Sequence, residues 1–119
     1  MTCKSIALLR RRPDLTYEAF VDYYEHRHAP LILSLLDGII DYRRNFARFE
    51  GAFVSPAAAP FDFDVVTELW FADRAAYDRA MALATRQDIA ARIAADEENF
   101  LDRSATRMFL VEERRSGIA

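Results

Sequence analysis

Two kinds of apolar pattern alternate along the chain, and their order limits the folds that it can adopt. Short apolar or alternating runs, typical of β-strands, occur at residues 4–11, 39–49, 63–71 and 106–113. After the first and the third of these runs, apolar residues recur every three or four positions, as on one face of a helix. The order is therefore β-α-β-β-α-β. With right-handed crossovers it predicts an α+β, ferredoxin-like fold, in which both helices cover one face of a four-stranded antiparallel sheet.

The first helix has a clear beginning and an irregular end. Thr16 is a good N-cap, and Asp37-Gly38 is a suitable stop. The apolar stripe between them comprises Tyr17, Phe20, Tyr24, His28, Leu31 and Leu35. Pro30 interrupts it, because proline has no N–H for the carbonyl of His26 and disfavours helical angles at Ala29. We therefore expect the helix to bend, end or loosen near His28.

The second helical region follows the third strand. Asp73 is its expected N-cap, and around Gln87-Asp88 a second helical piece begins, carrying Ile89, Ile93 and Phe100. Two prolines and a glycine make residues 50–62 a loop. The chain of 119 residues has no repeat or low-complexity tract and is 52% hydrophobic, so we expect one domain over residues 1–119.

The strand at residues 63–71 presents two different faces. One set of side chains is suited to packing beneath helices: Phe63, Val65, Thr67, Leu69 and Phe71. The other set mixes apolar groups with carboxylates: Asp64, Val66, Glu68 and Trp70. Such a mixed face suits neither water nor a dry core. It predicts a homodimer, a dimeric α+β barrel, whose two sheets enclose a semi-polar cavity.

Charge and composition exclude several classes of function. A net charge of −3 gives no reason to expect nucleic-acid binding, and the run Arg10-Arg11-Arg12 is interpreted as a solvated strand end. Cys3 is the single cysteine, so no internal disulfide forms and the reducing cytoplasm is expected. The N-terminal apolar run is too short for a signal or membrane segment. No phosphate loop, dinucleotide fingerprint or nucleophile elbow occurs, and no cofactor is expected.

Both histidines of the chain, His26 and His28, lie just before Pro30. On a regular helix they are separated by about 200° around the axis, so they face different directions. This separation argues against a metal bound by the pair. Glu25 and His28 could meet as an i,i+3 pair, but two ligands make a poor zinc site and no cysteine completes it.

His28 is the candidate catalytic residue. A histidine with an unperturbed pKa of about 6.5 can donate or accept a proton near neutral pH, although a buried ring satisfied by backbone groups is an equal alternative. Candidate substrate contacts are Tyr24, Tyr42, Asn45, Glu68 and Trp70. Glu68 is either an acid/base or an ion-pair partner of Arg43 or Arg44, and polar contacts along the strand are as good an interpretation of Tyr42 and Asn45. The acidic run at residues 96–98 is interpreted as a solvated helix face.

Four motifs together resemble the EthD domain family of the dimeric α+β barrel proteins. They are "LLRRRPDLTYEAFVDYYEHRHAPLI", "YRRN", "ELWF" and "DEENFLDRS", and the resemblance extends from Lys4 to about Glu112. Similar proteins include fungal dehydratases and decarboxylases of aromatic polyketide pathways and a bacterial protein associated with ether degradation. Related barrels with the same fold include polyketide cyclases and cofactor-independent quinone-forming monooxygenases. The resemblance implies that His28 corresponds to the family histidine, which is the usual acid/base candidate. Where the family often has tryptophan earlier in this helix, the chain has Tyr24.

The resemblance implies a small cofactor-independent enzyme for a hydrophobic, aromatic or oxygenated molecule. His28 would move a proton next to a carbonyl, in a dehydration, cyclisation or related lyase step. Cofactor-free oxygenation is the alternative within enzymes, and a non-catalytic small-molecule binder or accessory protein is the alternative outside them.

Overall fold

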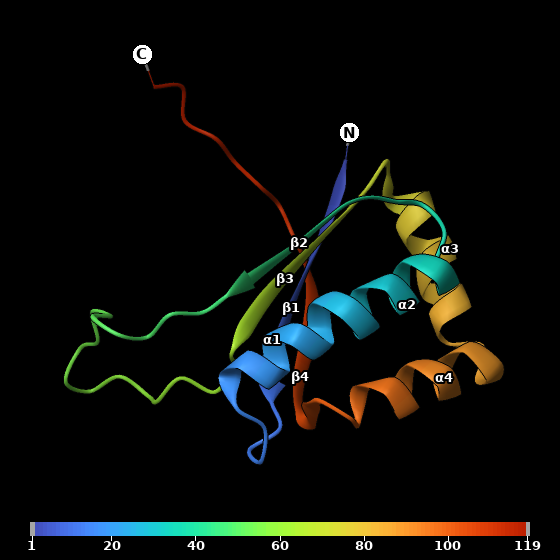
Figure 1. Cartoon of the computed structure of the whole chain (residues 1–119). Helices are drawn as coiled ribbons and strands as arrows, with labels where there is room; N and C mark the ends of the chain where they lie inside the picture. The colour runs from blue at the N-terminus through green and yellow to red at the C-terminus, as the bar shows by residue number, and fades with distance from the viewer. Residues whose placement is uncertain (1, 119) are drawn as a thin grey trace.

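The computed structural model describes residues 2–118 and confirms the predicted order of strands and helices (Figure 1). The strands are β1 (Cys3–Arg11), β2 (Ile39–Phe46), β3 (Val65–Phe71) and β4 (Leu101–Val111). The helical segments are α1 (Tyr17–Tyr23), η1 (Tyr24–His28), α2 (Ala29–Leu35), α3 (Arg74–Ala84) and α4 (Gln87–Glu97). The four strands form one antiparallel sheet in the order β2-β3-β1-β4. This is the predicted α+β, ferredoxin-like arrangement.

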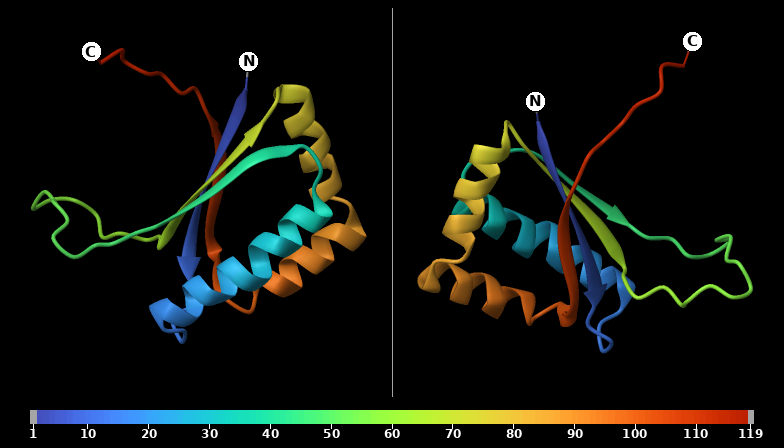
Figure 2. Two further views of the ribbon diagram at one scale, coloured as in Figure 1. Left: turned by 45° about the horizontal axis from the view of Figure 1, so that its top comes forward. Right: turned by 180° about the vertical axis from the view of Figure 1, so that it is seen from behind.

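All the helices within residues 2–118 lie on one side of the sheet, and none of them covers its other side (Figures 1 and 2). Alternate residues of β3, from Val65 to Phe71, are buried beneath the helices, whereas the residues between them are only partly buried. We call the uncovered side the open face. By strand register it carries Lys4, Ile6, Leu8, Arg43, Asn45, Val66, Glu68, Trp70, Arg107, Phe109 and Val111.

The helix after β1 loosens near His28, as the position of Pro30 predicts. Residues 24–28 form one π-helical turn, in which the N–H of Ala29 bonds to the carbonyl of Tyr24, five residues back. Ala29 nevertheless keeps helical angles, with φ −60° and ψ −45°, so the expectation that it would leave them is wrong. Pro30 lies in the first turn of α2, a position that tolerates proline because the N–H there has no partner within that helix.

The π-turn also shifts the buried stripe of this helix. Phe20, Tyr24 and His28 are buried as the sequence spacing predicts. Beyond them the buried residues are Ile32 and Leu36, whereas the predicted Leu31 and Leu35 are only partly buried. An i→i+5 bond adds one residue to a turn, and each later position is displaced accordingly.

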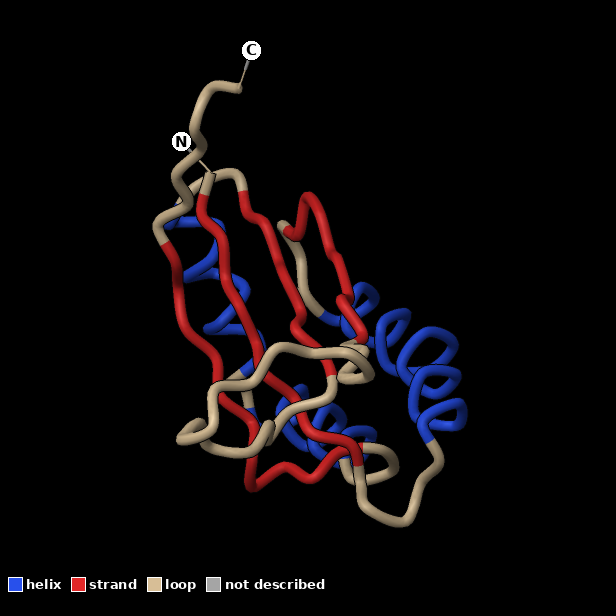
Figure 3. Tube along the Cα trace, turned by 90° about the vertical axis from the view of Figure 1, so that its left-hand side faces the viewer, coloured by secondary structure: helices blue, strands red, loops and turns tan. Residues whose placement is uncertain are grey.

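Several strand boundaries differ from the predicted ones. The second strand stops at Phe46 instead of residue 49, and the third starts at Val65 instead of residue 63. Between them residues 47–64 form a long arm, closed at its base by a bond of 2.8 Å from the N–H of Ala47 to the carbonyl of Asp64. The arm passes in front of the open face in Figure 3.

The last strand begins at Leu101, five residues earlier than predicted, because a register shift in β1 allows Arg10 and Arg11 to pair with it. Helix α4 correspondingly ends at Glu97, so Phe100 lies beyond it and not on its stripe. Phe100 is fully buried and packs against Phe20. No helix within residues 2–118 is long and apolar enough to cross a membrane.

Candidate functional site

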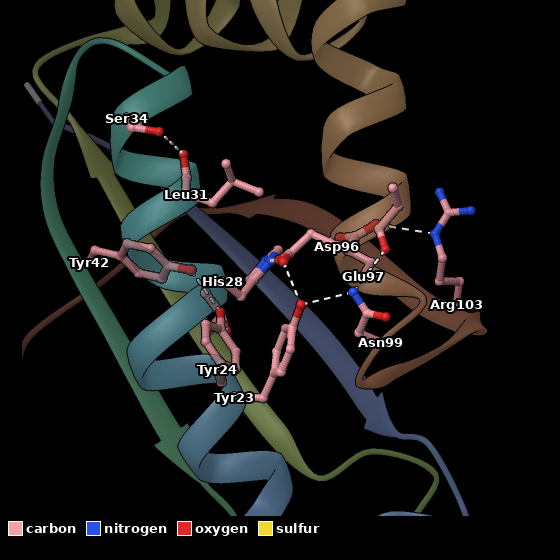
Figure 4. A network of polar contacts seen from close by, with 12 residues as sticks. Tyr23, Tyr24, His28, Leu31, Ser34, Tyr42, Asp96, Glu97, Asn99 and Arg103 are labelled. Atoms are coloured by element: carbon pink, nitrogen blue, oxygen red, sulfur yellow. Dashed lines mark hydrogen bonds and ion pairs between the residues drawn. The ribbon is translucent and has the colours of Figure 1, made fainter.

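His28 is the last residue of the π-turn and is buried between this segment and α4 (Figure 4). Its Nδ1 lies 2.7 Å from a carboxylate oxygen of Asp96. The imidazole ring packs against Phe100, with centroids 4.8 Å apart, and edge-on against Tyr24 at 5.2 Å. Only 4% of the residue is exposed. His28 therefore has a fixed ring and a charged partner at one of its two nitrogens.

Asp96 is held from two directions. One carboxylate oxygen contacts His28, and the other accepts a hydrogen bond of 2.7 Å from the hydroxyl of Tyr23. Asn99 in turn donates its amide N–H to that hydroxyl at 2.9 Å. The side chain of Asp96 is 14% exposed, so the interpretation of this acidic run as a solvated helix face is wrong for Asp96. The spacing of Asp96 behind Ile93 on the apolar stripe is the sequence signal that points to its burial.

The His28–Asp96 pair is suited to proton transfer. An ionised carboxylate can only accept a hydrogen bond, so the proton of a neutral imidazole is held on Nδ1. Nε2 then carries the free lone pair and is the nitrogen available to a substrate. When a proton reaches Nε2, the adjacent carboxylate stabilises the imidazolium. The pair can therefore act first as a base and then as an acid.

Three hydroxyl groups form a second polar cluster beside His28. The hydroxyl of Tyr24 lies 2.6 Å from that of Thr67 and 2.9 Å from that of Tyr42. Burial raises the pKa of Tyr24 to about 12 and also raises that of Tyr42. Both phenols therefore stay protonated near neutral pH. They can donate hydrogen bonds to an oxygen of a substrate but do not serve as bases.

Arg44 closes the outer side of this hydroxyl cluster. Its guanidinium lies over the ring of Tyr42, 4.8 Å from the centroid, and pairs with the carboxylate of Glu25 at 2.6 Å. The hydrogen bond with Glu25 raises the pKa of Arg44, so its positive charge is permanent. Glu25 thus pairs with Arg44 instead of His28, contrary to the i,i+3 pair that the sequence allowed.

The other predicted contact residues lie on the open face. Glu68 pairs with Lys4 at 2.6 Å and accepts a hydrogen bond of 3.0 Å from Asn45. The ring of Trp70 lies beneath the ammonium of Lys4, at 4.4 Å, and the guanidinium of Arg43, at 4.8 Å. The hydrogen bond from Lys4 is the main cause of a lowered pKa of Glu68, which therefore remains ionised at neutral pH.

The predicted ion pairs of Glu68 with Arg43 or Arg44 are wrong, because Arg43 pairs with Asp41 and Arg44 with Glu25. The candidate residues also fall into two groups that the sheet separates. His28, Tyr24 and Tyr42 lie on the helix-covered side, and Asn45, Glu68 and Trp70 lie on the open face. The six candidate residues therefore form two separate clusters, one on each side of the sheet.

His26 faces away from this cluster, as the helical spacing predicts. Its side chain is 74% exposed, and its Nε2 lies 3.5 Å from Asp22. Within residues 2–118, no three side chains of histidine, cysteine, aspartate or glutamate gather closely enough to hold a metal ion.

The family model of the EthD domain matches residues 12–104, which include His28 and Asp96. The chain belongs to the EthD family. No curated protein sequence matches this EthD protein.

Three solved structures share the fold of this EthD protein. An ethyl tert-butyl ether D (EthD) family protein of Bacillus halodurans C-125 has 23% identity and a TM-score of 0.62 over 96% of this chain and 100% of its own. SnoaB of Streptomyces nogalater, described as a cofactor-independent oxygenase, has 13% identity and a TM-score of 0.60, with coverages of 97% and 95%. A dimeric protein of unknown function from Bacteroides fragilis, with a ferredoxin-like fold, has 12% identity and a TM-score of 0.55, with coverages of 94% and 96%.

An apolar groove of about 600 Å³ lies on the helix side of the EthD fold, between the α2–β2 turn and α3. Its lining consists of Asp37, Gly38, Ala76, Arg79, Ala80, Ala82, Leu83 and Arg86. Leu83 also packs against the buried cluster that includes Ile32 and contacts Tyr42. Leu83 and Tyr42 therefore pack against the same buried cluster, and the lining of the groove includes neither Tyr42 nor His28.

Proposed function

We propose that this EthD protein is a cofactor-independent enzyme that moves a proton at a carbon next to a carbonyl group, with His28 as the acid/base. The observation that supports this proposal is the buried contact of 2.7 Å between His28 Nδ1 and Asp96, which leaves Nε2 as the proton acceptor. A buried imidazole with a carboxylate partner is a common arrangement for general acid–base catalysis.

The proposed reaction begins when Nε2 removes the proton from the carbon. The electron pair of the C–H bond moves towards the carbonyl, whose oxygen becomes negatively charged. The phenols of Tyr24 and Tyr42 remain protonated, so they are suited to donate hydrogen bonds to that oxygen. In a dehydration, Nε2–H then protonates the departing hydroxyl; in a cyclisation, the carbanion attacks a second carbonyl carbon, and Nε2–H protonates the resulting alkoxide.

The surroundings favour an apolar substrate. The His28 ring packs against Phe100 and Tyr24, and Tyr42 packs against a buried cluster of apolar residues that includes Ile32. A hydrophobic molecule with aromatic or carbonyl oxygens fits such walls. Because only 4% of His28 is exposed, side chains around its ring must move before a substrate reaches Nε2, and the proposal requires that the contact with Asp96 is kept during this movement.

A second candidate is cofactor-free oxygenation, which the likeness to SnoaB favours. The first step is the same removal of a proton by His28, and the carbanion then reacts with O₂ instead of losing water or closing a ring. The fold is shared at 13% identity, so the likeness supports this alternative without deciding between the two.

Proton transfer can be tested before the natural substrate and product are identified. A panel of ketones, β-keto acids and phenolic ketones is incubated with the protein in D₂O, and exchange of hydrogen next to the carbonyl is followed by NMR. We expect exchange that depends on wild-type protein and is lost in His28→Ala but kept in His26→Ala. An oxygen electrode separates oxygenation from the other reactions. Binding of panel members without exchange or turnover would instead support a non-catalytic binder.

We also propose that the protein acts as a homodimer joined through the open face. The supporting observations are the uncovered sheet with its mixed charged and apolar side chains, and the likeness to a dimeric protein of the same fold.

A further inference from the structure

The arm formed by residues 47–64 carries large apolar side chains that the rest of the described chain leaves exposed. Phe53 is 90% exposed, Val54 is 50% exposed, and Phe61 and Phe49 are 45% and 37% exposed. The arm leaves the body on the side away from the helices (Figures 1 and 2). Exposed apolar groups gathered on one projecting segment indicate a binding surface.

The base of the arm is anchored firmly to the sheet. Phe49 and Phe61 are stacked with ring centroids 4.3 Å apart, and Phe63 packs edge-on against both. The carboxylate of Asp62 makes two contacts of 3.0 Å with the guanidinium of Arg107, which belongs to the open face. The arm therefore crosses one end of the open face, as Figure 3 shows, and this base holds its tip beyond the sheet.

We propose that the arm clasps a second copy of this chain, with Phe53 packed on that copy. The proposal rests on the homodimer proposed above. If the sheet of a second copy packs on the open face, it must lie beside the arm, because the arm crosses one end of that face. The open face offers apolar side chains to such a partner, among them Ile6, Val66 and Phe109. By symmetry, each copy would contribute an arm and receive one.

Charge favours a second copy over a lipid surface. The arm has one arginine, Arg48, against three acids, Glu50, Asp62 and Asp64, which gives a net charge of −2. Anionic membranes attract basic segments, so this arm lacks the charge that a membrane anchor uses. The open face instead carries both signs, which suits a copy of itself.

Photo-cross-linking tests whether the contact is between chains. In a Cys3→Ser background, Phe53→Cys is labelled with benzophenone maleimide and irradiated, after sedimentation has established the oligomeric state of the labelled protein. We expect a covalent species of twice the 13.7 kDa chain mass. Mixing ¹⁵N-labelled and unlabelled chains identifies the attachment site on the other chain. Leu33→Cys is the matched control, because it is 52% exposed on the helix side, and it should give no such species.

A second measurement does not depend on labelling. Phe53→Ser should weaken the dimer by roughly tenfold or more, whereas Leu33→Ser should leave its dissociation constant unchanged. A dimer that is as tight in Phe53→Ser as in the wild type, or cross-links confined to one chain, would overturn the proposal. Pelleting of the protein with phosphatidylcholine vesicles in place of cross-linked dimers would overturn it too. A wild-type monomer in sedimentation would remove the homodimer itself and leave the catalytic proposal untouched.

Discussion

Replacing Asp96 with asparagine tests the pair at the centre of the site. In the wild type the carboxylate accepts hydrogen bonds from both His28 and Tyr23. An asparagine side chain has one accepting oxygen and one donating NH₂, so it cannot accept from both. All the groups are satisfied if the side-chain oxygen of the new asparagine accepts the hydrogen bond from the Tyr23 hydroxyl and its NH₂ donates to Nδ1 of His28. The proton of His28 must then move to Nε2, and the base is blocked.

The size of the effect follows from the two lost charged contacts. A hydrogen bond to a charged group contributes about 1.5–3 kcal/mol and a neutral one about 0.5–1.5 kcal/mol, so the substitution should cost about 2 kcal/mol of folding stability. For a chain of 119 residues, this loss lowers the melting temperature by roughly 6–10 °C. Turnover per folded molecule should fall by about 10²- to 10⁴-fold, because Nε2 can no longer accept a proton.

The assay is a ¹H–¹⁵N correlation spectrum of the imidazole nitrogens at pH 8. The chain has two histidines, and exposed His26 serves as the internal reference. We expect His28 to carry its proton on Nδ1 in the wild type and on Nε2 in Asp96→Asn. An unprotonated Nδ1 of His28 in the wild type would refute the pairing with Asp96. An Asp96→Asn variant with the wild-type tautomer and melting temperature would refute it too.

Three further outcomes are expected. His28→Ala should reduce turnover per folded molecule by about 10²- to 10⁴-fold while His26→Ala does not, and equal rates in both variants would exclude a catalytic His28. Sedimentation at micromolar concentration should give twice the chain mass of 13.7 kDa, and a clean monomer would contradict the homodimer. Because the pKa of Glu68 is lowered in the fold, its pair with Lys4 stabilises the protein above the ordinary pKa of glutamate and is lost as the pH falls through the lowered value. Urea unfolding of Glu68→Gln should therefore show a deficit of about 1 kcal/mol at pH 7 that disappears near pH 2, and a deficit that persists there would refute the ionic origin.

Much of the fold could be predicted because local patterns and tertiary packing agree. The N-caps Thr16 and Asp73 each accept the expected backbone hydrogen bond, and β3 alternates between buried and partly buried residues as its sequence alternates. Strand ends are harder to predict, because they depend on non-local pairing. Leu101 joins the sheet only because a bulge between Leu8 and Arg10 brings a second stretch of β1 into register with it.

The candidate site could be predicted less well, for a different reason. Sequence alternation shows which residues of one strand share a face, but it does not say which face a helical residue meets. The sequence alone does not show whether His28 and Glu68 face the same cavity, and in the structure the sheet separates them. The burial of Asp96 is easily missed, because its neighbours Glu97 and Glu98 suggest a solvated run although its spacing from Ile93 places it on the apolar stripe. The contact between His28 and Asp96 joins residues 68 positions apart, which no local pattern reveals.

Burial also changes what a loss of stability can reveal about His28. A His28→Ala substitution leaves the carboxylate of Asp96 without its imidazole partner, so it costs stability whether or not the histidine is catalytic. A lowered melting temperature therefore does not separate a core histidine from a catalytic one. The rate per folded molecule does, because only a catalytic role requires a free Nε2.

The π-turn explains how one segment can serve packing and chemistry together. An uninterrupted α-helix over residues 17–35 would bury one continuous stripe. The residue that the π-turn adds lets α1 and α2 each present a different stripe to the sheet. Tyr24 and His28, at the two ends of the turn, are both buried, and they reach different partners, Thr67 of the sheet and Asp96 of α4. Pro30 favours this arrangement, because it removes the N–H that would bond to His26 in a regular helix and so weakens the competing α-helical register. The unusual pairing of two histidines with a nearby proline thus has a physical consequence: the proline favours the turn, His28 enters the core, and His26 remains in solvent.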